Sequence, residues 1–470
     1  MTFNFKKMFI QQIYTNCLAH AAYYIESGNE AAVIDPLRDP APYIKLAKER
    51  GASIKYVLET HFHADFVSGH IDLANKTGAS IVFGPNATPA YKAYIAEDGE
   101  MLHIGHIKLQ VVHTPGHTVE STCYLLYTEE GVKNAIFTGD TLFVGDVGRP
   151  DLLSGNLPKE ALAEMLYHSL EDKIKTLPDD VIVYPGHGAG SACGKNIGKD
   201  SYSTIGIQKA TNYALRSVSK EAFITAVTSD LPSIAGYFFK DAVINRTGYK
   251  SFDEVLETNL KPLQASQFLE LQKQGALVLD TRDPMTFAAG FIKGAVNIGL
   301  KGEFAVWVGT LIDADTPLLL VTDTGKEMEA IERLARIGFE NVKGYLDGGM
   351  KTWFIGKRAY ETILTLDGSN CEELIANGDY SLLDVRNRLE VAKNRMTGSM
   401  HIPLNILNKQ FNTLDKNTKW LVYCAGGYRS MIAASYLRAN DFHFVASIEG
   451  GIKDVMTLAP HLVEEVDEER

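Results

Sequence analysis

The segment Thr60-His-Phe-His-Ala-Asp-Phe66 places two imidazoles and a carboxylate in one short loop. It follows the apolar run Ile54 to Leu58, which predicts a buried strand. Alternate residues of an extended chain point to the same side, so we expect His61 and His63 to face one direction. The segment therefore predicts a polar loop at the end of a strand that offers several donors to a metal ion.

Three more loops of this kind follow apolar runs in the first half of the chain, which holds most of the thirteen histidines. They are Thr114-Pro-Gly-His117, Thr138-Gly-Asp140 and Tyr184-Pro-Gly-His187. Glycine and proline turns hold such side chains at strand ends, where donors from different strands can converge. A single histidine is more often structural than metal-binding, but the four loops together predict a metal centre.

The chain is long enough for about three domains, because 470 residues exceed the roughly 100 to 200 residues of a typical domain. Short apolar runs alternate with helix-like stretches through most of the first half, which predicts an α/β domain. From Gly188 to about Pro262 helix-like patterns predominate, and this stretch is expected to cap the first domain.

The rest of the chain contains an internal repeat. In each copy an apolar run contains or ends in Asp, and a second apolar run leads into a loop and a helix, which predicts two small α/β domains. The repeated pairs are Ala276–Arg282 with Ser381–Arg386, Leu319–Asp323 with Leu421–Cys424, and Tyr345–Gly349 with Ser447–Gly451. Tyr360 to Asn370 is the predicted linker between the copies.

A cysteine follows the second of these runs in the last copy, in the loop Cys424-Ala-Gly-Gly-Tyr-Arg429-Ser. Gly426 and Gly427 let backbone N–H groups turn towards the sulfur, and the loop opens onto a predicted helix, so both features favour a thiolate. A thiolate is nucleophilic and can carry a persulfide. In the other copy Asp323 takes the place of the cysteine, and a carboxylate cannot carry sulfane sulfur.

The four polar loops resemble the H-x-H-x-D-H, H, D and H loops of the metallo-β-lactamase superfamily, in the same order. The resemblance covers roughly residues 1 to 260 and implies an αββα sandwich. Phe66 departs from the pattern, because the dinuclear zinc hydrolases of the superfamily place a histidine ligand of the second metal there. A phenyl ring cannot coordinate a metal. A second metal site is therefore disfavoured, and the first is left with a choice among His61, His117 and Asp140.

Within the superfamily the chain resembles the persulfide dioxygenases, which oxidise a thiol persulfide to sulfite. The resemblance implies one Fe(II) per chain bound by His61, His117 and Asp140, a set that leaves about three positions for a sulfur substrate and O₂. The other polar residues of the loops are expected to hydrogen-bond bound water or to orient the ligands. They are His63, Asp65 and His187. The rival interpretation is a dinuclear zinc thioesterase of the glyoxalase II type with an accessory sulfur carrier, against which Phe66 argues.

Two residues near the predicted centre have two interpretations each. Arg149 lies in a segment that resembles the G-R-x-D segment beside the substrate pocket of the family. It either binds an anionic thiol carrier or forms an ion pair with Asp151. Cys193, just beyond His187, either relays a sulfur atom near the iron or is a small buried residue.

The Cys424 loop resembles the C-x-x-x-x-R active site of the rhodaneses, and the match extends over roughly residues 361 to 470. It implies that Cys424 carries sulfur, that Arg429 attracts sulfite or thiosulfate, and that the residues between them bind the substrate. Those residues are Ala425, Gly426, Gly427 and Tyr428. Residues 263 to 360 are then an inactive rhodanese-like domain that serves as spacer, docking surface or oligomer contact, and residues 1 to 262 are the metal-binding domain.

These features predict an enzyme that oxidises low-molecular-weight persulfides with O₂ to sulfite and uses Cys424 to convert sulfite to thiosulfate, as in sulfide detoxification. Sulfur could also flow from Cys424 towards the iron, and the direction is left open. The carrier thiol is also open: glutathione, coenzyme A, bacillithiol, cysteine or polysulfide. A sulfur sensor or carrier without turnover is a third interpretation, which the complete donor set and cysteine loop disfavour.

Composition limits the partners and the compartment. The formal charge of −12 would repel nucleic acid and anionic membranes, which leaves small molecules as partners. Five scattered cysteines favour reduced thiols. No apolar run approaches the roughly 20 residues of a membrane span or the shorter core of a signal peptide. We therefore expect a cytoplasmic protein, and related enzymes suggest a homo-oligomer, either a dimer or a tetramer.

Overall fold

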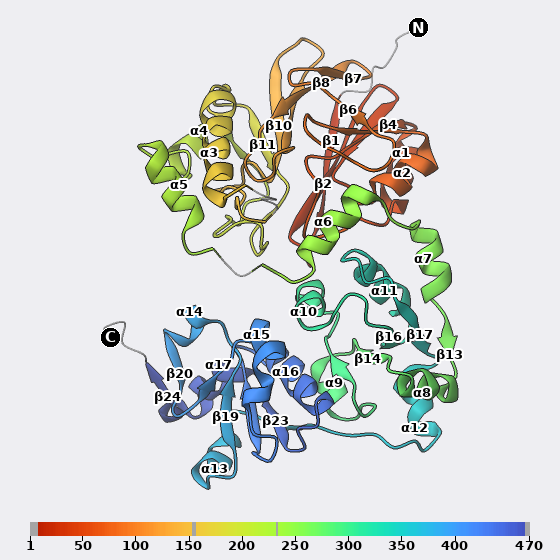
Figure 1. Cartoon of the computed structure of the whole chain (residues 1–470), viewed down its shortest axis with the longest axis vertical. Helices are drawn as coiled ribbons and strands as arrows, with labels where there is room; N and C mark the ends of the chain where they lie inside the picture. Colours follow the sequence, from red (N-terminus) through yellow and green to blue (C-terminus); the bar gives the residue numbers. More distant parts are fainter. Residues whose placement is uncertain (1–7, 153–156, 232–233, 466–470) are drawn as a thin grey trace. The chain divides into compact units, whose positions relative to one another are not determined.

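The computed structural model describes residues 8–152, 157–231 and 234–465 (Figure 1). The chain divides into two units. The first comprises Met1–Val255 and Ala335–Gly338, and the second comprises Leu256–Leu334 and Phe339–Arg470. Among the described residues, no helix has the length and apolar character needed to cross a membrane.

Two six-stranded sheets form the centre of the first unit. The first sheet follows the order of the sequence: β1 (Phe9–Thr15), β2 (His20–Ser27), β3 (Glu30–Ile34), β4 (Ser53–Leu58), β5 (Ser80–Phe83) and β6 (Tyr94–Ile95). The second has the order β12 (Ser203–Thr204), β11 (Ile182–Pro185), β10 (Lys133–Gly139), β9 (Thr122–Tyr127), β8 (Ile107–His113) and β7 (Met101–Ile104).

The alternation of side chains along each strand gives every sheet two buried faces. On β2, Tyr23 and Ile25 pack with residues of the other sheet, whereas Tyr24 packs with the helices outside. Helices cover both outer faces, as Figure 1 shows, and the predicted αββα sandwich is confirmed. They are α1 (Ala41–Arg50) and α2 (His70–Thr77) on the first sheet, and α3 (Lys159–Ser169) and α5 (Lys220–Thr228) on the second. The remaining helical segments are a π-helical turn (Leu170–Ile174), α4 (Ile205–Thr211), α6 (Phe238–Thr247) and α7 (Phe252–Asn259).

Parallel pairing brings the polar loops to common sheet edges. Strands β3 and β4 run parallel with Ile34 opposite Leu58, so the residues that follow them leave the sheet side by side. Strands β10 and β11 are also parallel, with Phe137 opposite Tyr184. The loops predicted to carry metal donors therefore start at neighbouring strand ends.

The second unit contains two parallel five-stranded sheets with equivalent strand orders, which confirms the predicted tandem of rhodanese-like α/β domains. The first has the order β13 (Pro262–Leu263), β17 (Val342–Leu346), β16 (Leu318–Val321), β14 (Leu277–Asp280) and β15 (Val296–Asn297). The second has the order β18 (Leu364–Leu366), β23 (Val445–Ile448), β22 (Trp420–Tyr423), β19 (Ser381–Asp384) and β21 (Met400–His401). A separate ribbon pairs β20 (Asn394–Met396) with β24 (Val463–Glu465).

Helices alternate with these strands. In the first copy they are α8 (Ala265–Lys273), α9 (Pro284–Ala288), α10 (Phe304–Leu311), α11 (Glu327–Ala335) and α12 (Gly349–Ile355). In the second copy they are α13 (Cys371–Ala376), α14 (Arg388–Val391), α15 (Leu404–Gln410), α16 (Tyr428–Ala439) and α17 (Gly451–Leu458), with 3-10 turns at Phe411–Thr413 and Pro460–Leu462. The predicted linker from Tyr360 to Asn370 is wrong in part, because β18 lies inside it and pairs with β23 as an edge strand.

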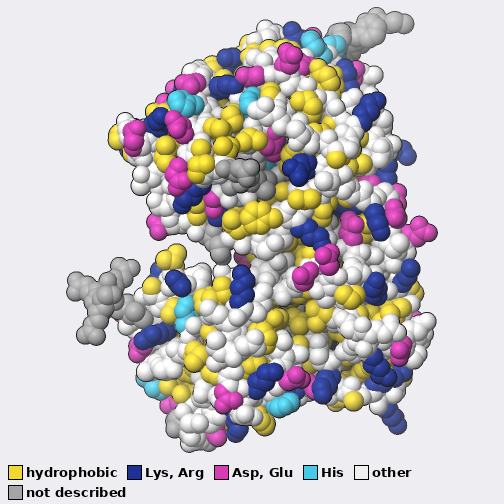
Figure 2. Space-filling model, in the orientation of Figure 1, with side chains coloured by type: hydrophobic (Ala, Val, Ile, Leu, Met, Phe, Trp, Pro, Cys, Tyr) yellow, Lys and Arg dark blue, Asp and Glu magenta, His cyan; other side chains and the backbone are white. Residues whose placement is uncertain are grey.

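Basic and acidic side chains are interspersed over the face drawn in Figure 2, together with apolar ones. Neither sign of charge dominates that face.

Candidate metal centre and sulfur-transfer loop

The predicted metal donors lie at the ends of strands from both sheets. His61 follows β4, His117 follows β8, Asp140 follows β10 and His187 follows β11. All four side chains are at most 2 % exposed. Burying polar groups without partners is energetically costly, so a cluster of this kind is stabilised by hydrogen bonds, bound protons or a bound cation.

Three of these residues form one donor set: atoms of His61, His117 and Asp140 lie within 4.8 Å of one another. The Asp140 Oδ2 atom is 3.4 Å from His117 Nε2 and 4.0 Å from His61 Nε2. Neither carboxylate oxygen of Asp140 has a hydrogen-bond partner among the described residues. The structure thus brings together the three predicted ligands, and their chemistry fits a divalent metal ion.

Hydrogen bonds fix the two imidazoles in the tautomer that a ligand needs. His117 Nδ1 lies 2.9 Å from the carbonyl oxygen of Arg149, which can only accept, so Nε2 carries the lone pair. His61 Nδ1 lies 3.0 Å from Thr60 Oγ, which donates to Asp35 at 2.8 Å. Burial, with the neighbouring imidazoles, holds the pKa of His61 well below its usual value. Both rings therefore direct a lone pair towards Asp140.

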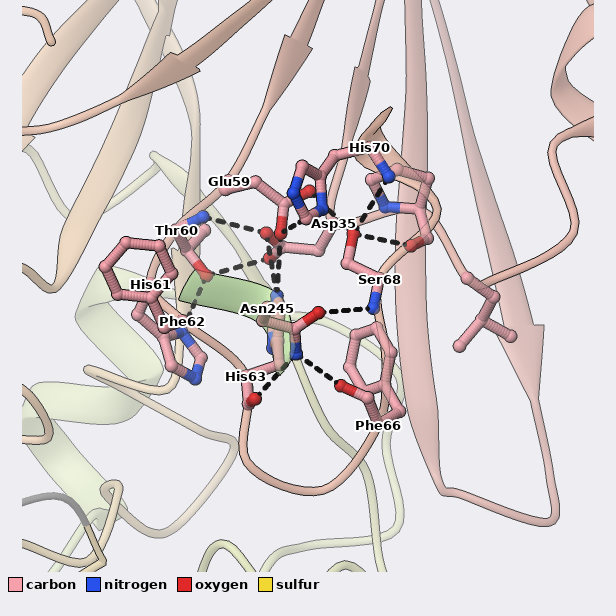
Figure 3. Close-up of polar contacts among 12 residues, drawn as sticks. Asp35, Glu59, Thr60, His61, Phe62, His63, Phe66, Ser68, His70 and Asn245 are labelled. Atoms are coloured by element: carbon pink, nitrogen blue, oxygen red, sulfur yellow. Dashed lines mark hydrogen bonds and ion pairs between the residues drawn. The ribbon is translucent and has the colours of Figure 1, made fainter. Parts of the chain in front are cut away.

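His63 belongs to a different group, with Asp35 and Glu59 (Figure 3). Its ring centroid lies 4.2 Å from that of His61, but its Nε2 atom is 3.1 Å from Asp35 and 3.7 Å from Glu59. Burial alone would lower the pKa of His63, but the two carboxylates outweigh it and raise the pKa to about 9. The expectation that His61 and His63 face one direction is therefore wrong, because Asp35 holds the second imidazole.

The backbone of this loop is held from helix α6. Asn245 donates to the carbonyl oxygens of His63 and Phe66, both at 2.7 Å, and accepts from the N–H of Ser68 at 2.9 Å (Figure 3). The Phe66 ring packs on His63 with centroids 4.3 Å apart. Phe66 thus occupies buried space beside the centre without offering a donor.

A second donor set adjoins the first. Atoms of Asp65, His187 and Cys193 lie within 4.8 Å of one another, and all three side chains are buried. Burial, with Asp65 and Asp140 nearby, raises the pKa of the Cys193 thiol well above its usual value. The burial of Cys193 agrees with its interpretation as a small structural residue. Its neighbours Asp65 and His187 are polar, however.

Arg149 is committed to an ion pair. Its guanidinium donates to both carboxylate oxygens of Asp151, at 2.7 and 2.8 Å, and the side chain is buried. Its assignment to substrate binding is therefore not supported by this geometry, which matches the ion-pair interpretation. The residue acts instead through its backbone, whose carbonyl oxygen orients His117.

The Cys424 loop forms the cradle that its glycines predict. Gly427 has a left-handed φ of 90°, and its N–H donates to Cys424 Sγ at 3.2 Å. Helix α16 begins at the next residue, so the sulfur lies near its N-terminus. The Cys424 side chain is 1 % exposed, whereas Asp323 at the equivalent position of the first copy is exposed.

Arg429 and Tyr428 have partners that the motif did not predict. The Arg429 guanidinium donates to both oxygens of Glu390, at 2.6 and 2.8 Å, so its charge is balanced within the domain. Burial opposes this effect, but Arg429 still holds the pKa of Glu390 below its usual value. The Tyr428 hydroxyl donates to the carbonyl oxygen of Gly299 in the first copy at 2.8 Å. The side chains of both residues are thus engaged with protein groups.

Two family models and solved structures match this architecture. The model of the metallo-beta-lactamase superfamily matches residues 15–187, and that of the rhodanese-like domain matches residues 264–355 and 369–457. A crystal structure of a metallo-beta-lactamase from Staphylococcus aureus subsp. aureus COL is 34% identical with a TM-score of 0.65, and the match covers 73% of this chain and 99% of that one. The chain belongs to the metallo-β-lactamase superfamily.

Curated proteins that resemble this chain include members of two activity classes. The human mitochondrial persulfide dioxygenase ETHE1 is 33% identical over 161 residues, 34% of this chain and 59% of that protein. The probable hydroxyacylglutathione hydrolase glo2 of Schizosaccharomyces pombe is 34% identical over 161 residues, 33% of this chain and 58% of that protein. The chain thus spans somewhat less than two thirds of these relatives. Sequence identity does not separate the two classes.

Sequence reasoning missed Asp35 and Glu59 beside this metallo-β-lactamase centre, and Glu390 beside the sulfur-transfer loop. Asp35 directly follows the apolar run of β3, as Asp140 follows that of β10, so the same strand-end signal was present. Glu59 directly precedes the histidine loop and was equally visible. Glu390 belongs to a capping box with Asn387, whose N-x-x-E spacing can be found in a sequence, although its pairing with Arg429 cannot.

Proposed function

We propose that the metal centre oxidises low-molecular-weight persulfides at one Fe(II) held by His61, His117 and Asp140. The observation that carries this proposal is the engagement of His63 by Asp35, which leaves two imidazoles and one carboxylate at the centre. That set is typical of non-haem Fe(II) oxygenases. The rhodanese-like domains in the same chain support a sulfur substrate.

The overall reaction balances as one persulfide, O₂ and water giving one thiol, one sulfite and two protons. When bound, Fe(II) supplies the redox chemistry by which O₂ takes four electrons from the outer sulfur. The protein holds the ligands rigidly: Arg149 and Thr60 fix the imidazole tautomers, and Asp35 steadies Thr60. The buried surroundings of these ligands limit the access of water.

Cys424 would then dispose of the sulfite. Its thiolate takes the outer sulfur of a second persulfide and releases the thiol, and the resulting cysteine persulfide passes that sulfur to sulfite as thiosulfate. The Gly427 N–H lies where it can stabilise negative charge on the cysteine sulfur. In the resting protein the Arg429 guanidinium is paired with the Glu390 carboxylate, so the role of Arg429 is to fix the conformation of the Cys424 loop.

The rival function is thioester hydrolysis of the glyoxalase II type, which the hydrolases among the relatives keep open. The test is to load the full chain anaerobically with Fe(II) or with Zn²⁺ and to supply glutathione persulfide or S-lactoylglutathione. We expect O₂ uptake only with iron and persulfide, with little thioester hydrolysis in either form. Rapid thioester hydrolysis by the zinc form without persulfide-dependent O₂ uptake by the iron form would establish the hydrolase instead.

A further inference from the structure

The inactive first rhodanese copy contacts the residue that begins helix α16. The Tyr428 hydroxyl donates to the carbonyl oxygen of Gly299 at 2.8 Å, so this hydrogen bond joins the two copies. Burial, with the carboxylate of Glu303 nearby, raises the pKa of the Tyr428 hydroxyl. The hydroxyl therefore stays protonated at neutral pH and remains a donor to the first copy.

Glycines of the first copy leave room for the Tyr428 ring. A Cβ at Gly299 would lie 3.5 Å from a ring carbon of Tyr428, and a Cβ at Gly302 would lie only 3.0 Å from one. Gly302 also has a φ of 115°, in a region that other residues rarely adopt. The segment from Gly299 to Gly302 therefore has the shape needed to receive a side chain of the other copy.

Two further hydrogen bonds join the copies at points away from the loop. Ser435, two turns further along α16, accepts from the buried N–H of Asn297 on β15 at 2.9 Å. The side-chain amide of Asn408 on α15 donates to the carbonyl oxygen of Thr310 on α10, also at 2.9 Å. These bonds hold α15 and α16 against the first copy, so the acceptor for the tyrosine hydroxyl has a fixed position.

The Cys424 loop has little conformational restriction of its own. Gly426 and Gly427 are adjacent glycines, and a Cβ at Gly426 would meet no described atom within 4 Å. Gly427 nevertheless has to present its N–H to Cys424 Sγ, which is 3.2 Å away. Tyr428 is bonded to Gly427, so a fixed tyrosine limits the rotation of the glycine that carries this donor.

The two residues that end the loop are held from different copies. Glu390 of the second copy accepts both hydrogen bonds of the Arg429 guanidinium, whereas Gly299 of the first copy accepts from Tyr428. The loop thus depends on the first copy at one residue, and that residue adjoins the glycine whose N–H faces the sulfur. A change at this contact is expected to reach the sulfur without disturbing the ion pair.

We propose that the inactive first copy positions the Cys424 loop through Tyr428. This proposal rests on the sulfur transfer proposed for Cys424 and adds a residue that holds the reactive loop in place. Tyr428 acts on the sulfur through Gly427, so it is a positioning residue. The first copy then contributes to sulfur transfer although Asp323 replaces its cysteine.

The first test is Tyr428→Phe in the full chain, because Tyr428 also lines a cavity of about 590 Å³ and phenylalanine keeps the ring that bounds it. Loss of the hydroxyl should lower the maximal rate of sulfur transfer about tenfold, with the KM for sulfite little changed. The rate of Cys424 alkylation should fall as well, because the donor that stabilises its thiolate is less well placed. O₂ uptake should stay the same.

Gly302→Ala tests the same contact from the first copy. Its Cβ would press on the Tyr428 ring, so both the transfer rate and the rate of Cys424 alkylation should fall, although no residue of the second copy has changed. Gly275→Ala is the matched control, because Gly275 of the first copy also has a positive φ, of 99°, and an added Cβ there would meet no described atom within 4 Å. It should leave both rates unchanged.

Ser435→Ala separates the effect of Tyr428 from general contact between the copies. It removes the acceptor for the Asn297 N–H and is expected to lower the temperature of thermal unfolding, yet to leave both rates unchanged. Wild-type rates in Tyr428→Phe or Gly302→Ala would overturn the positioning role. An equal loss of rate in Ser435→Ala or Gly275→Ala would overturn it as well.

The alkylation experiment also separates this proposal from the proposed function. Mass spectrometry of the labelled peptide measures alkylation of Cys424 apart from that of the other thiols. A wild-type chain that transfers no sulfur would overturn the proposed sulfur transfer, whereas the alkylation rates of the same variants would still decide whether Tyr428 positions the loop.

Discussion

Replacing His117 with alanine is expected to remove the metal from the first site and to lower persulfide-dependent O₂ uptake on the order of a thousandfold or more. His117 provides one of only two imidazoles directed at Asp140, and its Nε2 atom lies 3.4 Å from that carboxylate. Alanine leaves two donors, which hold a divalent ion poorly. Iron content after anaerobic reconstitution and the rate of O₂ uptake measure the effect.

His103→Ala is the matched control, because His103 is exposed on β7 and belongs to none of the donor sets found among the described residues. It should keep both the iron and the full rate. Thermal unfolding of the two variants separates loss of the ligand from loss of the fold. A His117→Ala protein that still binds iron and consumes O₂ at the wild-type rate would remove His117 from the metal site and weaken the whole proposal.

The donors of the metal centre could be predicted because each follows an apolar run within a few residues. His61, His117 and Asp140 all show this local pattern, and His117 and Asp140 also follow a glycine. The direction of His63 could not be predicted in this way. The direction of the His63 ring depends on the parallel pairing of β3 and β4. This pairing brings together Asp35 and Glu59, which are 24 positions apart along the chain.

The second donor set shows a different limit. Cys193 lies beyond His187 in a segment without a regular element, so neither periodicity nor strand ends place its sulfur. Only the folded chain brings it to Asp65. The sequence shows that Phe66 offers no donor, but it does not show that the sulfur of Cys193 lies near Asp65.

The backbone conformation of the sulfur-transfer loop could be predicted from the sequence, but the partners of its side chains could not. The left-handed conformation of Gly427 and the start of α16 follow from the glycine pair and the helix-like run after it. The ion pair of Arg429 with Glu390 joins two elements, and the bond of Tyr428 to Gly299 joins two domains. A motif shows which residues are present, but it does not show which neighbours balance their charges or accept their hydrogen bonds.

Cys424→Ser separates the two chemical steps most sharply. A serine hydroxyl cannot accept sulfane sulfur, so thiosulfate formation should fall on the order of a thousandfold or more while O₂ uptake continues. The product should change from thiosulfate to sulfite, which chromatography of derivatised products measures. Cys371→Ser is the control, because this buried thiol of the same domain packs in the apolar core and donates to the Gly368 carbonyl oxygen.

The product ratio also tests the direction of sulfur flow. If Cys424 receives sulfite from the oxidation step, its loss leaves the rate of O₂ uptake unchanged and lets sulfite accumulate. If Cys424 instead delivers sulfur to the metal centre, its loss should slow O₂ uptake when thiosulfate is the sulfur source. Undiminished thiosulfate formation in Cys424→Ser would refute the first route, because Asp323 at the equivalent position of the other copy cannot form a persulfide. Undiminished O₂ uptake with thiosulfate as the sulfur source would refute the second.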